Sequence, residues 1–96
     1  MEVKIRFFTN LREIVGNREE TLTFAQAEPV TINFVLQFLS KKYGSRFNDY
    51  LYASTGQPKN FLQFLVNGIS MSTLDGFETS LKDGDVLAIL PPVGGG

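Results

Sequence analysis

The chain has 96 residues, 43% of them hydrophobic, and its 9 Lys and Arg against 10 Asp and Glu leave a net charge of −1. The length suits one domain with a single core, and the balanced charge gives no reason to expect nucleic acid or an anionic membrane as a partner. Cysteine and histidine are absent, which excludes disulfides, thiol nucleophiles and the commonest metal ligands.

Hydrophobic residues are spread along the chain and not gathered into one long run. No stretch approaches the roughly 20 apolar residues of a membrane span. The N-terminal residues also lack the basic and apolar segments of a signal peptide. We therefore expect a soluble, cytoplasmic protein.

The first part of the chain predicts two strands joined by a helical turn. Apolar and charged residues alternate over residues 2–7, as in a half-buried strand, and Phe8 falls on the polar side of that alternation. Residues 10–15, closed by Gly16, suit a short helical turn. Residues 21–24 predict a second strand that returns against the first.

The main helix is predicted to begin after Thr31, a suitable N-cap, and to end at Gly44. One face has helical spacing and should be buried; its residues are Ile32, Val35, Leu36, Leu39 and Tyr43. Phe34 and Phe38 lie on roughly the opposite face. We expect the aromatic segment 47–52 to fold over them, the alternative being an exposed binding stripe.

The last third of the chain predicts a hairpin and a final strand. Residues 61–66 and 69–71 flank Asn67-Gly68, a dipeptide that suits a tight hairpin turn. Residues 86–90 are apolar at every position, so this strand is either buried on both faces or keeps one face for a partner. One long helix on a small mixed sheet predicts an α+β fold of two layers.

The chain ends in two prolines and three glycines, which predicts a domain over residues 1–90 and an extended, flexible tail over residues 91–96. Pro91 and Pro92 keep the segment out of helix and central strand. When extended, such a tail reaches about 20 Å, enough to enter the active site of a partner. The alternative is a terminus without function.

The terminal carboxylate of Gly96 is the most reactive group that the sequence offers. It is ionised at neutral pH, since an α-carboxyl titrates at about 3.3–3.7, and must be activated before it can transfer anything. An acyl-adenylate made by a partner with ATP is the simplest form of activation. Gly94 and Gly95, which lack a Cβ, would then fit a narrow channel.

The other polar residues do not suggest an independent active site, a metal site or a cofactor. Without His or Cys, the common nucleophile and base pairs cannot be assembled. The acidic residues considered are interpreted as solvated loop or surface charges; they are Glu13, Glu19, Glu20, Asp75, Asp83 and Asp85.

Several segments together resemble the MoaD family of the MoaD/ThiS superfamily. MoaD is the small, ubiquitin-like sulfur-carrier subunit of molybdopterin synthase. The segments that carry the resemblance are 3–8, 11–16, 66–68, 81–86 and 91–96. The Phe7-Phe8 pair with Leu11-Arg12-Glu13, and the Pro-Pro-Val-Gly-Gly-Gly ending, are its most specific parts.

The resemblance implies a β-grasp fold, with the first and last strands parallel at the sheet centre and the helix across one face. It implies a non-catalytic carrier subunit without a cofactor of its own. Gly96 would be adenylated by an ATP-dependent enzyme similar to ubiquitin-activating enzymes, and would then receive sulfur from a donor as a thiocarboxylate. The tail would insert into the large subunit of molybdopterin synthase, with Gly95 completing the diglycine signature.

Phe8 and Leu90 match family positions that contact partners. The sequence departs from the usual pattern at two places. Gly94 gives three terminal glycines instead of a pair, and the segment from Gly44 to Asn60 is longer and more aromatic than in the shortest bacterial members. Two roles stay open for this segment, namely enlargement of the fold and binding of a further partner.

Two other functions remain open beside sulfur delivery for molybdopterin. One shares the activation of Gly96 but ends in tRNA thiolation or in an isopeptide bond to lysines of target proteins. The other is a β-grasp interaction module whose glycine end has no role. Deletion of Gly95 and Gly96 would leave the activity of such a module unchanged and would abolish that of a carrier.

Overall fold

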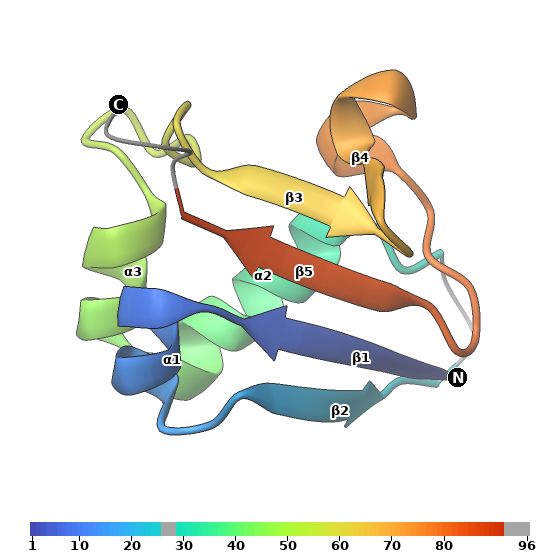
Figure 1. Cartoon of the computed structure of the whole chain (residues 1–96), viewed down its shortest axis with the longest axis horizontal. Coiled ribbons are helices and arrows are strands. Elements are labelled where there is room, and N and C mark those ends of the chain that lie inside the picture. Colours follow the sequence, from blue (N-terminus) through green and yellow to red (C-terminus); the bar gives the residue numbers. More distant parts are fainter. Residues whose placement is uncertain (26–28, 92–96) are drawn as a thin grey trace.

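The computed structural model describes residues 1–25 and 29–91, which form a mixed sheet covered on one face by helices (Figure 1). Five strands make up the sheet: β1 (Glu2–Phe7), β2 (Glu19–Thr23), β3 (Gln63–Val66), β4 (Ile69–Ser70) and β5 (Val86–Leu90). The α-helices are α1 (Thr9–Val15), α2 (Ile32–Tyr43) and α3 (Ser45–Leu51). Two short 3₁₀ helices follow β4, η1 (Met71–Thr73) and η2 (Gly76–Glu78).

The strand order β2-β1-β5-β3-β4 places the first and last strands side by side in the middle of the sheet. β1 and β5 are parallel, while β2 on β1, β3 on β5 and β4 on β3 are antiparallel. The predicted two-layer α+β architecture and the parallel central pair of a β-grasp fold are confirmed.

Local sequence signals explain most element boundaries. β1 alternates between exposed and buried positions along its whole length, as its pattern predicts. Gly16 ends α1 with a φ of 88°, a conformation that glycine adopts without a Cβ clash. Asn67 and Gly68 both have positive φ, as the tight turn between β3 and β4 requires.

α2 begins and ends where the sequence predicts. The Thr31 hydroxyl accepts a hydrogen bond from the backbone N–H of Phe34, and Gly44 follows the last helical residue. Four of the five predicted stripe residues are fully buried, and Tyr43 is half-buried. The core lies between this stripe and the inward side chains of β1, β3 and β5, including Val3, Ile5, Phe64, Leu87 and Ile89.

The segment after Gly44 corrects one prediction. It forms α3, whose Phe47 and Leu51 are fully buried in the core, with the Phe47 ring 5.9 Å from that of Tyr43. Segment 47–52 therefore does not fold over Phe34 and Phe38. Those two rings pack edge-on against Phe24 instead, at 5.5 and 5.4 Å between ring centroids.

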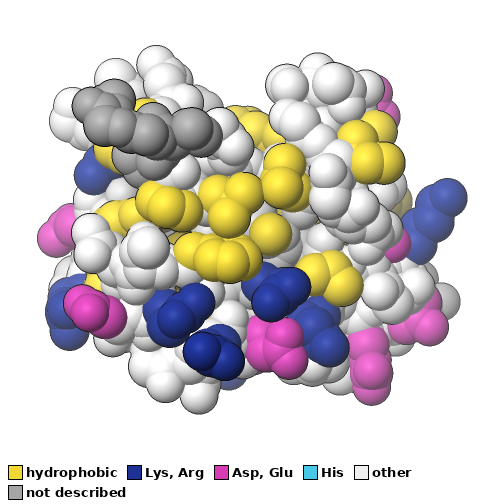
Figure 2. Space-filling view, viewed as in Figure 1, with side chains coloured by type: hydrophobic (Ala, Val, Ile, Leu, Met, Phe, Trp, Pro, Cys, Tyr) yellow, Lys and Arg dark blue, Asp and Glu magenta, His cyan; other side chains and the backbone are white. Residues whose placement is uncertain are grey.

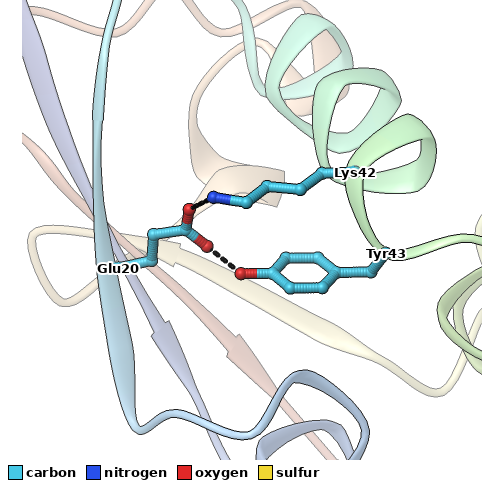
Figure 3. A network of polar contacts seen from close by, with 3 residues as sticks. All are labelled: Glu20, Lys42 and Tyr43. Atoms are coloured by element: carbon cyan, nitrogen blue, oxygen red, sulfur yellow. Dashed lines mark hydrogen bonds and ion pairs between the residues drawn. The ribbon is translucent and has the colours of Figure 1, made fainter.

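The interpretation of Glu20 as a simple surface charge is also wrong. Glu20 pairs with Ile5 in the sheet register, so its side chain points to the face that the helices cover. There its carboxylate accepts hydrogen bonds from the Tyr43 hydroxyl and the Lys42 ammonium, which tie β2 to the end of α2 (Figure 3). Burial, and then the hydrogen bond and charge of Glu20, raise the pKa of Tyr43 above its usual range.

Candidate partner interface

The central strand β5 leads directly into the tail. Its side chains alternate, with Leu87 and Ile89 buried toward the helices and Val86, Ala88 and Leu90 half-buried on the other face. Pro91, also half-buried, is the last residue that the structure describes. The chain therefore leaves the domain from the middle of the sheet.

The sheet face opposite the helices carries an apolar surface, which we call the open-face patch. Its members are Phe8, Leu65, Val86, Ala88 and Leu90, all half-buried. The register explains the patch, because Leu65 of β3 pairs with Ala88 of β5, and Ala88 also neighbours Arg6 of β1. Figure 2 shows hydrophobic side chains gathered over the middle of this face, with Lys and Arg along one border.

Phe8 and Leu90, the two residues predicted from the sequence, are brought to the same end of this patch. Phe7 pairs with Ile89 in parallel register, and Phe8 and Leu90 each follow by one residue. Phe8 keeps an extended backbone, with φ −126° and ψ 150°, so the alternation of β1 continues through it. Its side chain therefore points away from the core, and the Arg6 guanidinium lies 5.8 Å from the centre of its ring.

Charged residues border the patch on its β1 and β2 side. Lys4 and Arg6 reach toward Glu19 on β2, at 3.8 and 4.0 Å between charged atoms. These side chains are about half exposed, so the ion pairs add little stability and remain free to exchange partners. An apolar centre with a charged rim is the usual composition of a protein interface.

The predicted tail residues are only partly within the structure. Pro92, Gly94, Gly95 and Gly96 lie outside the described residues. The boundary between residues 1–90 and the tail at 91–96 therefore stays a prediction. The structure describes the root of the tail, namely Leu90 and Pro91, and the surface beside it.

Within residues 1–25 and 29–91, no group of three or more His, Cys, Asp or Glu side chains could hold a metal ion. The same part of the chain contains no helix with the length and apolar character needed to cross a membrane. Asp85, one of the loop carboxylates, accepts hydrogen bonds from the Asn67 amide and the backbone N–H of Lys82 and so shapes a turn.

Leu65 is the member of the patch that the sequence did not point to. It lies in the predicted strand 61–66, where Leu62, Phe64 and Val66 are buried and the residues between them face outward. The signal was present as an apolar residue on the outward side of an alternating strand, the same signal that marked Phe8.

Comparison with known proteins gives a match along nearly the whole chain. The model of the ThiS family matches residues 5–96. Small archaeal modifier protein 3 of Haloferax volcanii is 33% identical over the full length of both chains. A proposed sulfur carrier protein of Archaeoglobus fulgidus is 29% identical, again over the full length of both.

Solved structures agree with the fold. The solution structure of small archaeal modifier protein 1 from Methanosarcina acetivorans superposes with a TM-score of 0.79 and 35% identity, covering 99% of this chain and 96% of that one. The ubiquitin-like β-grasp fold, expected from the sequence resemblance, is therefore confirmed, and so is membership of the MoaD/ThiS superfamily.

Proposed function

The chain belongs to the ThiS family, and on that premise we propose that it is a carrier whose terminal Gly96 carboxylate is activated and then bears sulfur. The observation that carries the proposal is the position of β5. This central strand brings the root of the tail, Leu90 and Pro91, to an apolar patch with a charged rim, and a partner that contacts the patch could also receive the tail.

The proposed chemistry has two steps. In an ATP-dependent adenylyltransferase, a Gly96 carboxylate oxygen attacks the α-phosphorus of ATP, and pyrophosphate leaves. Hydrosulfide supplied by a sulfur donor then attacks the carbonyl carbon of the acyl-adenylate. The bond to AMP breaks, and a thiocarboxylate remains. The absence of a Cβ on Gly96 leaves the carbonyl carbon open to attack.

In this scheme the residues before Gly96 bind the partner or position the tail, and none of them is catalytic. Phe8 and Leu90, which are half-buried in the open-face patch, contact the partner. Apolar side chains that a partner buries contribute much of the binding energy of an interface. Pro91 and Pro92 keep the tail extended, and Gly94 and Gly95 pass through a narrow channel.

We further propose that the sulfur is used to make molybdopterin, with the chain acting as the small subunit of molybdopterin synthase. The support is the sequence resemblance, in particular the ending over residues 91–96 and the Phe7-Phe8 pair. The tail would then enter the large subunit, and the acceptor would be a pterin precursor.

A second acceptor is favoured by the full-length similarity to small archaeal modifier protein 3. In that case a lysine amine of a target protein attacks the activated Gly96 carbonyl. AMP leaves, and an isopeptide bond forms. The two acceptors share the activation step and differ in what attacks the carbonyl or receives the sulfur.

The first experiment separates a carrier from a plain interaction module. The intact chain is incubated with its activating enzyme, ATP and a sulfur donor, and its mass is measured. A gain equal to the exchange of one oxygen for one sulfur supports the carrier, and an unchanged mass contradicts it.

The second experiment identifies the acceptor. The thiocarboxylate form is mixed with the pterin precursor and a candidate large subunit, and in parallel the chain is incubated with ATP, the activating enzyme and lysine-bearing proteins. Formation of a dithiolene supports the molybdopterin role. A conjugate without dithiolene supports the modifier role.

A further inference from the structure

The outer side of α2 carries two adjoining hollows, which we call the outer groove. The smaller, of about 120 Å³, is lined by Phe34, Gln37, Phe38 and Lys41. The larger, of about 560 Å³, is lined by Asn33, Gln37, Ser40, Lys41, Tyr52, Gly56, Gln57 and Pro58. Gln37 and Lys41 line both hollows, so the two adjoin on the outer side of the helix.

The aromatic end of the groove is incompletely covered. Phe34 and Phe38 are 45% and 41% exposed, although each packs one edge against Phe24. Two phenylalanines one helical turn apart make a paired apolar surface on α2. A protein partner that covers both rings would remove their exposed apolar surface from water, which favours binding.

The rest of the groove is polar and carries one positive charge. Among residues 1–25 and 29–91, Lys41 is the cation of both linings, no carboxylate lines either hollow, and Lys41 makes no ion pair. Asn33, Gln37 and Gln57 supply side-chain amides to the larger hollow. Such a lining can accept a carboxylate at Lys41 and hydrogen bonds from a peptide backbone.

The groove lies on the opposite side of the molecule from the open-face patch. α2 crosses behind the sheet in the view of Figure 1, while the patch faces the reader in the same view in Figure 2. The far wall of the larger hollow is the loop that follows α3, with Tyr52, Gln57 and Pro58. The longer segment 44–60 thus enlarges the core through α3 and also builds this wall.

We propose that the outer groove binds a segment of a partner protein that presents an apolar side chain next to a carboxylate. The apolar side chain packs on Phe34 and Phe38, and the carboxylate pairs with Lys41. An extended segment can contact both adjoining hollows, which suits this site better than a compact small molecule does. A single cation is too little for nucleic acid, which proteins bind with several phosphate contacts. The proposal does not depend on the chemistry of Gly96.

The test uses four sets of short synthetic peptides, namely acidic and apolar, acidic and polar, basic and apolar, and neutral and polar. Binding to the intact chain is followed by amide chemical shifts in NMR. We expect the acidic and apolar set to bind, with shifts in α2 and residues 52–58. Equal or better binding by another set overturns the proposal, as does an absence of binding by all four.

Two variants locate the contact. Lys41→Glu should weaken binding roughly tenfold or more, because it reverses the charge at the exposed centre of the groove. Lys82→Glu, on an exposed turn outside both linings, is the matched control and should leave binding unchanged. Phe38→Ser should also weaken binding, with thermal unfolding measured to show that the variant folds.

The remaining outcomes are equally decisive. If free N-acetylglutamate competes as well as the acidic and apolar peptides, the groove is a small-molecule site and the proposal is wrong. If the affected shifts depend on protein concentration without peptide, the occupant is a second copy of the chain and the proposal is wrong. If Lys41→Glu binds as the wild type does, the carboxylate does not pair with Lys41.

Discussion

Phe7 and Ile89 are paired across the two central parallel strands, and both side chains are buried against the helices. Because side chains alternate along a strand, the residues that follow them, Phe8 and Leu90, face the other side of the sheet. Because the strands are parallel, both of these residues lie at the end where the tail begins. The register that builds the core therefore also builds the surface beside the tail.

This arrangement predicts that Leu90→Arg and Phe8→Ser weaken the contact with the activating adenylyltransferase. Each change removes an apolar group from the open-face patch without touching the buried face of the sheet. We expect the KM for the carrier in ATP–pyrophosphate exchange to rise roughly tenfold or more, equivalent to about 1.4 kcal/mol. Ile69→Ser, which alters an exposed apolar residue on β4, serves as the control. An unchanged KM for both patch variants would remove Phe8 and Leu90 from the interface.

The length of the tail gives a second prediction. One additional alanine after Gly96 should abolish adenylation, because the Gly96 carbonyl then belongs to an amide and carries no free carboxylate. Deletion of Gly95 and Gly96 should also abolish it, since the carboxylate moves back by about 7 Å. Both are measured as pyrophosphate release from ATP. Activity of the extended chain, with its mass shown to be untrimmed, would refute a mechanism at the terminal carboxylate.

The burial of α3 gives a third prediction, on stability. Phe47→Ala should lower the free energy of unfolding by about 3–5 kcal/mol, because the ring is fully buried in the core and packs against Tyr43. Phe61→Ala should cost less than about 1 kcal/mol, since Phe61 is 52% exposed and its close aromatic contact is with the Lys59 ammonium. Urea unfolding measures both. Similar losses for the two variants would show that α3 is not part of the core.

The features of this structure differ in how well the sequence predicts them. Those that depend on interactions between neighbouring residues are predicted better than those that depend on distant ones. Features that depend on a few neighbouring residues were predicted. They are the helix cap at Thr31, the helix ends at Gly16 and Gly44, and the outward position of Phe8. The ring against which Phe34 and Phe38 pack was not predicted, because Phe24 reaches them only once β2 and α2 are packed together.

The same limit applies to Glu20 and to α3. Glu20 lies 22 and 23 residues from its partners Lys42 and Tyr43, so no local pattern joins them. In α3, Phe47 and Leu51 are one helical turn apart, a spacing that could have indicated a short helix. The tail chemistry, in contrast, was predicted from composition and resemblance, and its residues beyond Pro91 lie outside the described part of the structure.

The contact of Tyr43 with Glu20 gives the last prediction, a dependence of stability on alkaline pH. A tyrosine hydroxyl has a pKa of about 10 when exposed in an unfolded chain. In the folded protein the pKa of Tyr43 is raised, first by burial and then by the Glu20 hydrogen bond and charge. Above pH about 10 the unfolded chain therefore releases this proton while the folded protein keeps it, and stability falls as the pH rises.

Tyr43→Phe removes the titrating group and should flatten this alkaline decline, measured as the free energy of unfolding in urea between neutral pH and the upper limit of reversible unfolding. At neutral pH the variant should lose about 1 kcal/mol, the usual contribution of one hydrogen bond. Glu20→Gln is the companion variant. This variant removes the charge of Glu20 but leaves Tyr43 buried, so the alkaline decline in stability should be smaller but still present. Every other ionisable group is common to the wild type and Tyr43→Phe, so the difference between those two curves reports Tyr43, and parallel curves would contradict the raised pKa.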